Sequence, residues 1–395
     1  MKTKFENNTL TICLEGRIDS NSAPKIEEEI FSEINKVSEA KVVLDLNELA
    51  YISSAGLRVL MKVKKEMKQD IPAVNVSPEV YEIFQTTGFT EILGVHKKLR
   101  EISVEGYEKL GEGGNGAVYR IDADTIVKVY KPWMDEEIID RERSFARTAF
   151  VNGIPSVIAF DMVRVDDCLG IVFEALNSDT LGHAMRNNPE KMPEYVDKYV
   201  ELAKTLHTTH VPEGSFTRIQ EVFHGYADNL GEWCTSEEIA LIHSLIDSIP
   251  DADTVTHNDL HPGNIMIQDG ELVLIDMPQV TMGPPIMDMV AVFRDMISAP
   301  QGDSAHHIEF SVGMPKELIV QAGNMFFMKY TGITDPAELE AYYKKLGLLY
   351  AMNVVLMPGT GAETAMKLGK GIMDKLLYPV VIPNEQAIRG LLQTM

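Results

Sequence analysis

The sequence predicts a small α/β domain over residues 1–100, followed by a larger second domain over residues 103–395. Three observations support this division. Strand-like and helix-like patterns alternate through the first hundred residues, a glycine-rich hairpin with strand-like flanks opens the rest, and the charge differs between the two parts. A chain of 395 residues is long enough for two or three domains with well-developed cores.

The front domain alternates β-branched runs with apolar positions at helical spacing, a pattern typical of α/β domains. The expected elements are, in chain order, a strand at Thr9–Leu14, a helix that begins near Pro24, a strand at Lys41–Leu46, a helix at Leu57–Met67, a strand at Ala73–Val76 and a helix at Pro78–Thr87. No Gly/Ser-rich or Pro-rich linker follows, so the short connection near residues 101–105 predicts coupling between the two domains.

The charge of the chain lies almost entirely in the second domain. Residues 1–100 carry 14 Lys and Arg against 15 Asp and Glu, whereas the whole chain carries 36 against 59, a net charge of −23. A surface of this sign repels nucleic-acid phosphates and anionic lipid headgroups, so we expect neither nucleic acid nor a membrane as a partner. It could favour a cationic substrate, or it could simply keep the protein in solution.

The sequence also indicates where the protein works. The first residues contain no uninterrupted apolar h-region, and no stretch reaches ~18 apolar residues, so we expect neither a secretory signal nor a membrane span. Cys13, Cys168 and Cys234 are single and widely spaced, with no metal-binding spacing and no disulfide framework. These features predict a cytoplasmic protein.

A glycine-rich run opens the second domain. Gly111, Gly113 and Gly116 precede Val118 in the run GEGGNGAV, between two strand-like segments. Glycines allow the tip of a hairpin to bring backbone N–H groups onto phosphate oxygens without a Cβ in the way. The alternative is a flexible hairpin that binds nothing, because such runs also occur by chance.

A lysine inside an apolar strand needs an anionic partner. Lys128 lies between apolar neighbours in IVKVYK, and we expect it to contact the α- and β-phosphates of a nucleotide. Lys131 is the alternative, although strand alternation places it at the strand end. Glu142 in the following helical segment would orient Lys128 as an ion pair. Glu137 is a second candidate for that role, and a solvated helix face is the alternative without function.

The run THNDLHPGNIMI contains a His-x-Asp-x-x-x-x-Asn spacing that seldom arises by chance. In such a loop the aspartate accepts or orients the proton of an acceptor hydroxyl, and the asparagine ligates Mg²⁺. We assign the first, catalytic role to Asp259 and the second to Asn264. His257 and His261 are expected to brace the loop by hydrogen bonds.

A hairpin ties a second metal ligand to this loop. Asp269 and Gly270 form a strong two-residue turn signal between two strand-like runs. Pairing outward from this turn sets Asn264 opposite Ile275, which places Asp276 at the open end of the hairpin beside Asn264. Two oxygen ligands at that position can share a hard cation such as Mg²⁺.

The segment YISSAGLRVL, which follows the strand KVVLDL, resembles the signature of STAS domains, the family of anti-sigma-factor antagonists. The resemblance covers about the first 100 residues and implies a regulatory or docking domain with an anti-sigma-factor-like partner. By position in the motif, Ser54 matches the serine that regulatory members carry as their phosphorylation site. A helix N-terminus would stabilise a phosphate there. The alternative is an N-cap serine that is never modified.

The second domain resembles the aminoglycoside phosphotransferase branch of the protein-kinase-like superfamily, across roughly residues 105–395. The resemblance implies an α+β fold of two lobes, about 103–175 and 176–395, and an enzyme that uses ATP and Mg²⁺. Glu174 and Leu176 fit the hinge between the lobes, whose backbone would meet the adenine edge. One departure is Pro278, which stands where the family usually has glycine.

Asp288 follows Asp276 after only 12 positions, whereas protein kinases need a longer activation segment to hold a peptide. We therefore expect transfer of the γ-phosphoryl of ATP to a hydroxyl of a small molecule, with the tail Met314–Met395 lining the acceptor site. The alternative is a signalling regulator in which this domain phosphorylates Ser54, in cis or in trans, to switch an anti-sigma-factor-like partner. A scaffold without activity is disfavoured because the catalytic set is complete.

Overall fold

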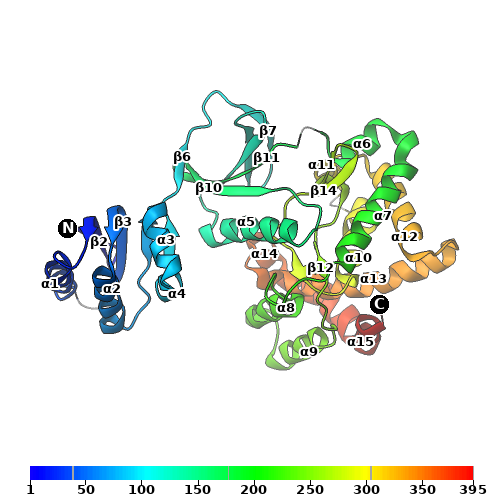
Figure 1. The fold of residues 1–395 in the computed structure, drawn as a ribbon. Coiled ribbons are helices and arrows are strands. Elements are labelled where there is room, and N and C mark those ends of the chain that lie inside the picture. Colours follow the sequence, from blue (N-terminus) through cyan, green and yellow to red (C-terminus); the bar gives the residue numbers. More distant parts are fainter. Residues whose placement is uncertain (38–39, 177, 303–304, 395) are drawn as a thin grey trace. The chain divides into compact units, whose positions relative to one another are not determined.

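The computed structural model describes residues 1–37, 40–176, 178–302 and 305–394 (Figure 1). The chain divides into two compact units, Met1–Ile102 and Ser103–Met395. No helix among these residues is both long enough and apolar enough to cross a bilayer.

The first unit is built on a five-stranded sheet in the order β1-β2-β3-β4-β5, in which only β1 and β2 are antiparallel and the other neighbours are parallel. Its elements are β1 (Lys2–Glu6), β2 (Thr9–Ile18), α1 (Ala23–Ile34), β3 (Lys41–Ile52), α2 (Ser54–Met67), β4 (Ala73–Val76), α3 (Pro78–Thr86), α4 (Phe89–Ile92), β5 (Val95–Lys97) and β6 (Arg100–Ile102). Strands and helices share one apolar core that includes Ile12, Leu44, Val63 and Phe84.

Helix α2 begins at Ser54, earlier than the predicted start at Leu57. The hydroxyl of Ser53 accepts hydrogen bonds from the backbone N–H groups of Ala55, at 3.2 Å, and Gly56, at 3.5 Å. A side-chain cap of this kind satisfies N–H groups of the first turn, which have no partner inside the helix. The apolar periodicity starts only inside the helix, so it misplaced the helix start, and the capping serine is Ser53.

The second unit opens with a sheet and one long helix. Within this unit the strands run antiparallel in the order β10-β11-β9-β8-β7, and α5 packs on β10 and β11. These elements are β7 (Glu108–Glu112), β8 (Gly116–Arg120), β9 (Thr125–Tyr130), α5 (Glu136–Val151), β10 (Ala159–Val165) and β11 (Cys168–Glu174).

The remainder of the second unit is mostly helical and carries two short hairpin-like pairs, β12 with β15 and β13 with β14. Its elements are α6 (Leu181–Asn187), α7 (Met192–Thr208), α8 (Ile219–Asp228), α9 (Ser236–Ile246), β12 (Val255–Thr256), β13 (Ile265–Gln268), β14 (Glu271–Leu274), β15 (Thr281–Met282), α10 (Ile286–Phe293), α11 (Ala305–Val312), α12 (Lys316–Thr331), α13 (Pro336–Leu356), α14 (Glu363–Ile372) and α15 (Glu385–Thr394). Two π-helical segments, η4 (Arg294–Ser298) and η7 (Met373–Val381), continue α10 and α14, and short 3₁₀ turns lie at Pro189–Lys191, Asn229–Glu232, Pro262–Asn264, Ala299–Gln301, Met357–Thr360 and Ile382–Asn384.

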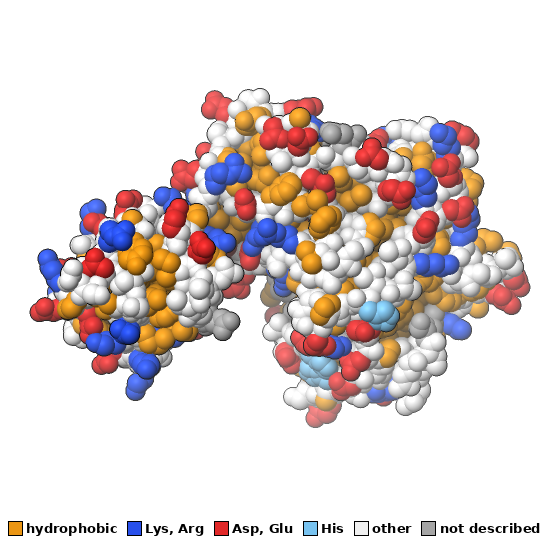
Figure 2. Space-filling view, in the orientation of Figure 1, with side chains coloured by type: hydrophobic (Ala, Val, Ile, Leu, Met, Phe, Trp, Pro, Cys, Tyr) orange, Lys and Arg blue, Asp and Glu red, His pale blue; other side chains and the backbone are white. Residues whose placement is uncertain are grey.

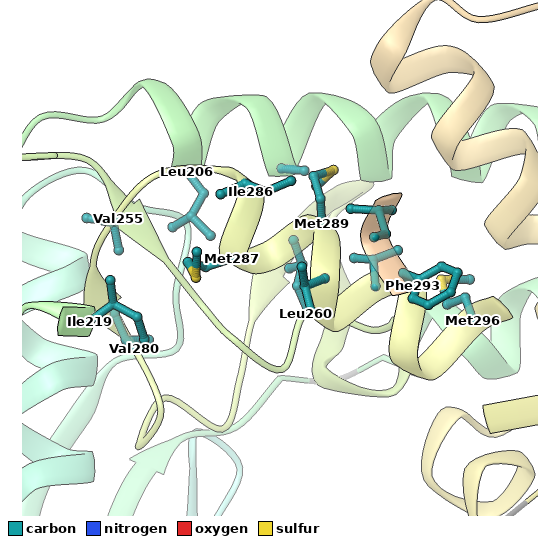
Figure 3. Packing of buried hydrophobic residues seen from close by; sticks show 14 of the residues in the cluster. Leu206, Ile219, Val255, Leu260, Val280, Ile286, Met287, Met289, Phe293 and Met296 are labelled. Carbon is teal, nitrogen blue, oxygen red and sulfur yellow. The ribbon is translucent and has the colours of Figure 1, made fainter. Parts of the chain in front are cut away.

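One apolar core runs beneath the loops of this helical part (Figure 3). Leu260 lies among the side chains of α10 and is fully buried. Its carbonyl oxygen accepts a 2.5 Å hydrogen bond from the hydroxyl of Tyr199 in α7. The segment around Leu260 is therefore held from two sides, by apolar packing and by a hydrogen bond.

Phe326 in α12 is fully buried, and its ring centroid lies 4.4 Å from that of Tyr199. We predict that Phe326→Ala lowers the free energy of unfolding of the second unit by about 3–5 kcal/mol, because it removes buried surface and leaves a cavity. Phe310→Ala is the matched control, since Phe310 in α11 is 75% exposed, and its effect should stay within about 0.5 kcal/mol. Denaturant titration measures both, and equal effects would contradict the packing described here.

Candidate active site

The glycine-rich hairpin contains two kinds of glycine. A Cβ on Gly116 would lie 2.1 Å from the carbonyl oxygen of Val129, so glycine is required there by the close approach of β8 and β9. Gly111 and Gly113 face open space, where a Cβ would meet nothing within 4 Å. The protein itself does not need glycine at these two positions, and their free space is available to a ligand. Val118 in β8 pairs directly with Lys128 in β9.

Lys128 joins three elements of the second unit. Its Nζ lies 2.7 Å from Oε1 of Glu142 in α5 and 2.9 Å from Oδ1 of Asp276, which follows β14. Burial of Lys128 favours its neutral form, but the carboxylates of Asp276 and Glu142 outweigh this effect and hold the pKa of the ammonium group above its usual value. The lysine therefore stays charged in a largely buried position.

The residues considered as alternatives to Lys128 and Glu142 have other partners. Lys131 contacts Glu112 at the edge of the hairpin, 3.2 Å away. Glu137 is exposed in the first turn of α5, where its backbone N–H is capped by Asp135. Neither residue lies within bonding distance of the partners of Lys128, in keeping with the strand alternation that favoured Lys128.

Asp259 and Asn264 lie in direct contact. The amide Nδ2 of Asn264 donates to Oδ2 of Asp259 at 2.8 Å and to its carbonyl oxygen at 3.0 Å. This use of Nδ2 leaves the amide oxygen of Asn264 available for a cation. Burial raises the pKa of Asp259, but electrostatic interactions with His261, Arg294 and His257 and the hydrogen bond from the Asn264 amide together bring this pKa below its usual value. The carboxylate is thereby kept charged.

The two histidines of the loop hold its shape. His261 caps the short turn Pro262–Asn264, because its Nδ1 accepts from the N–H of Gly263 at 3.1 Å. Nε2 of His257 lies 3.1 Å from the carbonyl oxygen of Ile275 and donates to it. Both side chains thus bond to backbone groups near the aspartate, as a bracing role requires.

Asp288 in α10 fixes the start of this loop. Its carboxylate accepts from the backbone N–H groups of His257, at 2.9 Å, and Asn258, at 2.6 Å, and it also lies 3.0 Å from Nε2 of His207. Asn258 has a φ of +63°, a conformation uncommon for residues other than glycine. The buried carboxylate therefore stabilises the backbone turn that precedes Asp259.

The hairpin β13–β14 has the predicted register. Gln268 pairs with Glu271, Asp269 and Gly270 both have positive φ, and the N–H of Ile275 donates to the carbonyl oxygen of Asn264 at 3.0 Å. Asp276 follows immediately, so Asn264 and Asp276 lie together at the open end.

The turn after this hairpin does not depend on a glycine. Asp276 itself has a φ of +61°, and the following Met277 is buried. Because Asp276 takes the left-handed conformation in this turn, Pro278 can occupy the position where glycine was expected.

The structure shows which backbone N–H groups of Glu174 and Leu176, at the end of β11, are available to bind a ligand. The N–H of Glu174 donates to the carbonyl oxygen of Ile158, and its Oε1 accepts from the N–H of Ile158 at 2.7 Å. The N–H of Ala175 donates to the carbonyl oxygen of Asp124. Among the described residues, the N–H of Leu176 has no such partner, so it is the N–H of this segment that remains available to an adenine ring.

Arg294 was not identified from the sequence. It lies at the start of η4, and its Nη2 is 2.6 Å from Oδ1 of Asp259 and 2.6 Å from Oδ2 of Asp295. The residue sits in the apolar run IMDMVAVFRDM, where it looks like the polar end of a buried helix. The sequence signal that could have identified this residue is an arginine followed by an aspartate inside an apolar run.

Ser54 in the first unit is exposed and is the first residue of α2. Its hydroxyl forms no hydrogen bond with the residues that the structure describes. It is therefore sterically accessible to a modifying enzyme.

The comparisons with known proteins agree with the two units. A family model described as the phosphotransferase enzyme family matches residues 107–310, which is more than half of the chain. The chain belongs to this family. A second family model, the STAS domain, matches residues 1–102. The fold classes predicted for both domains are thereby confirmed, and so is a kinase-like enzyme.

Curated relatives match the first unit. A Bordetella bronchiseptica protein named as an anti-sigma factor antagonist, BtrV, is 40% identical over 89 residues, which are 22% of this chain and 76% of that protein. The anti-sigma-B factor antagonist of Listeria monocytogenes is 29% identical over 94 residues, 23% of this chain and 81% of that protein.

Solved structures resemble the chain at low identity. The complex of gentamicin with the aminoglycoside phosphotransferase APH(2")-IIa is 15% identical, with a TM-score of 0.45 over 80% of this chain and 98% of that one. A choline/ethanolamine kinase family protein from Mesorhizobium loti is 14% identical, with a TM-score of 0.44 over 74% of this chain and 95% of that one.

We predict that Asp288→Asn lowers the free energy of unfolding by about 1–3 kcal/mol, because one of the buried N–H groups of His257 and Asn258 loses its acceptor. Asp253→Asn is the matched control. Asp253 is an exposed carboxylate 2.7 Å from His210, and surface pairs of this kind contribute about 0–1 kcal/mol. Denaturant titration distinguishes the two variants, and a neutral Asp288→Asn would contradict the bracing role.

Proposed function

We propose that the second unit transfers the γ-phosphoryl group of ATP to a hydroxyl group of a small molecule. One observation carries the proposal: Lys128 bridges Glu142 and Asp276 at the end of the hairpin where Asn264 contacts Asp259. A charged lysine, an oxygen ligand pair and a charged carboxylate are the groups that phosphoryl transfer needs in one place.

Each residue has a role that follows from its contacts. The open glycines Gly111 and Gly113 admit the phosphates under the hairpin, and Lys128 neutralises their charge. Asp259 receives or orients the proton of the acceptor hydroxyl, whose oxygen then attacks the γ-phosphorus while the bond to the β-phosphate oxygen breaks. Asp259 suits this role because its neighbours hold the pKa of its carboxyl below the usual value in spite of its burial.

The donor set fits Mg²⁺. Asp276 offers a carboxylate, and Asn264 offers the amide oxygen that its contact with Asp259 leaves available. Mg²⁺ binds through one or two protein oxygens, phosphates and water, so it does not require a larger protein cluster. In this position Mg²⁺ supplies positive charge to the phosphates. Within the described residues, no group of three or more His, Cys, Asp or Glu is arranged to hold a metal ion.

The segment after Asp276 favours a small acceptor over a peptide. β15 begins at Thr281 and pairs with β12, and α10 begins at Ile286. The chain between Asp276 and α10 is therefore short and tied to a neighbouring strand. Peptide-binding kinases use a long segment at this position.

We predict that the full chain binds Mg·ATP and that Asp259→Asn lowers turnover by about 10²–10⁴-fold with little change in Mg·ATP affinity, because Asp259 faces the acceptor. Asp276→Asn, the matched variant, should weaken Mg²⁺-dependent nucleotide binding itself. Calorimetry measures affinity, and ADP formation measures turnover. Absence of Mg·ATP binding at millimolar nucleotide, or normal turnover in Asp259→Asn, would contradict the proposal.

We further propose that the STAS domain binds an anti-sigma-factor-like partner and that the charge state of Ser54 controls this binding. The proposal is supported by the exposed, unbonded hydroxyl of Ser54 at the start of α2 and by the similarity of this unit to anti-sigma factor antagonists. A phosphate there adds a charge of about −2 beside a helix N-terminus.

Ser54→Asp and Ser54→Ala should therefore differ by roughly tenfold or more in partner binding, a difference of about 1.4 kcal/mol. Ser77→Asp is the control, since Ser77 also starts a helix but its hydroxyl accepts from the N–H of Val80. Mass spectrometry of cell extracts and of protein incubated with ATP tests for phosphate on Ser54. No phosphate in either sample, together with identical binding by the two Ser54 variants, would leave a passive docking domain.

A further inference from the structure

A cavity of about 440 Å³ lies against the candidate active site, within the second unit. Its wall includes Asn258, which precedes Asp259, Pro278, which follows Asp276, and Asn115 of the glycine-rich hairpin. Arg294, which contacts Asp259, also lines it. The cavity thus adjoins the glycine-rich hairpin, the loop that carries Asp259 and the turn that follows Asp276, and its volume suits a small organic molecule.

The charge of this cavity is opposite to that of the chain. Among the residues that the structure describes, its charged lining residues are Arg141 and Arg294, with no Asp, Glu or Lys. The chain carries 59 acidic against 36 basic residues, and Figure 2 shows red acidic side chains dispersed over the visible face. Acidic residues are abundant on the protein, yet the described part of the cavity wall contains none.

The two arginines differ in what they contact. Arg294 is occupied by Asp259 and Asp295. Arg141, in α5, is exposed and forms no hydrogen bond or ion pair with the residues that the structure describes. Its charge acts on Tyr226, another lining residue: burial raises the pKa of that phenol, and Arg141 partly offsets the rise. Arg141 is therefore a free cation at the cavity wall.

Most of the remaining wall is apolar. Ile219, Val280 and Met287 line the cavity and belong to the apolar core shown in Figure 3. Phe145 and Phe223 add aromatic surface from α5 and α8. The tail Met314–Met395 contributes side chains from α13 and the Met357–Thr360 turn. A bound molecule would gain affinity here mainly by burying apolar surface.

We infer that the acceptor is a hydroxyl compound with an apolar body and an anionic group that Arg141 binds, and that polycations such as aminoglycosides are poor acceptors. The inference rests on the proposed phosphoryl transfer and specifies its substrate class. A polycation needs a carboxylate for each ammonium group that it buries. The described lining residues include no carboxylate, and that of Asp259 beside the cavity is already paired with Arg294. In the reaction the acceptor oxygen gains the phosphoryl group, its proton passes to Asp259 and then to water, and ADP leaves.

The test uses the full chain and four probes: ω-hydroxydecanoate, decanediol, ω-aminodecanol and kanamycin. Calorimetry gives the dissociation constants. We expect ω-hydroxydecanoate to bind at least about tenfold more tightly than ω-aminodecanol or kanamycin. Arg141→Gln should weaken ω-hydroxydecanoate by about tenfold, leave decanediol nearly unchanged, and be rescued by Arg141→Lys. Arg147→Gln is the matched control, since Arg147 is exposed on the same helix and does not line the cavity.

Three results would overturn the inference: ω-aminodecanol or kanamycin binding as tightly as ω-hydroxydecanoate, no effect of Arg141→Gln on the preference, or no binding of any probe at millimolar concentration. ADP formation, measured in parallel with Asp259→Asn as the inactive reference, separates the two proposals. Selective binding without turnover contradicts the proposed phosphoryl transfer alone. If the probes are turned over but Arg141 does not determine which probe is preferred, only the inferred substrate class is contradicted.

Discussion

The position of Lys128 between two carboxylates is the constraint on which the candidate site depends. Its ammonium group draws together strand β9, helix α5 through Glu142, and the end of the β13–β14 hairpin through Asp276. A buried charge is costly unless it is paired, and here one lysine satisfies carboxylates from two distant parts of the chain. The sheet that carries the glycine-rich hairpin is thereby placed over the loop that carries Asp259.

The positions of residues that are determined by short-range sequence patterns were predictable from the sequence. The Asp269-Gly270 turn determines the register of its hairpin, and the register alone brings Asn264 beside Asp276. The choice of Lys128 over Lys131 followed from strand periodicity, whereas the sequence left Glu137 open as an alternative to Glu142. In the first unit the same rules found β4 and the α1 and α3 helices, since caps and apolar spacing are local properties.

Features that depend on tertiary contacts were missed. Arg294 meets Asp259 only because α10 packs beside the catalytic loop, and no spacing in the sequence relates the two residues. The occupied N–H groups of Glu174 and Ala175 depend on partners in other segments. Strand β1 has no buried residue and therefore no apolar alternation, although the positive φ angles of Asn7 and Asn8 show that an Asn-Asn turn marked its hairpin.

Both oxygens of the Asp259 carboxylate are already engaged, Oδ1 by Arg294 and Oδ2 by Asn264. Each contact removes a direction from which a hydroxyl group can approach. An acceptor with several hydroxyl groups can therefore present only those that reach the remaining lone pairs while its body fills the apolar cavity. Under the phosphoryl transfer proposed above, this arrangement would impose regiochemistry: the position of phosphorylation on a polyhydroxylated molecule would be selected by which hydroxyl fits between an arginine and an amide, and not by which hydroxyl is most acidic.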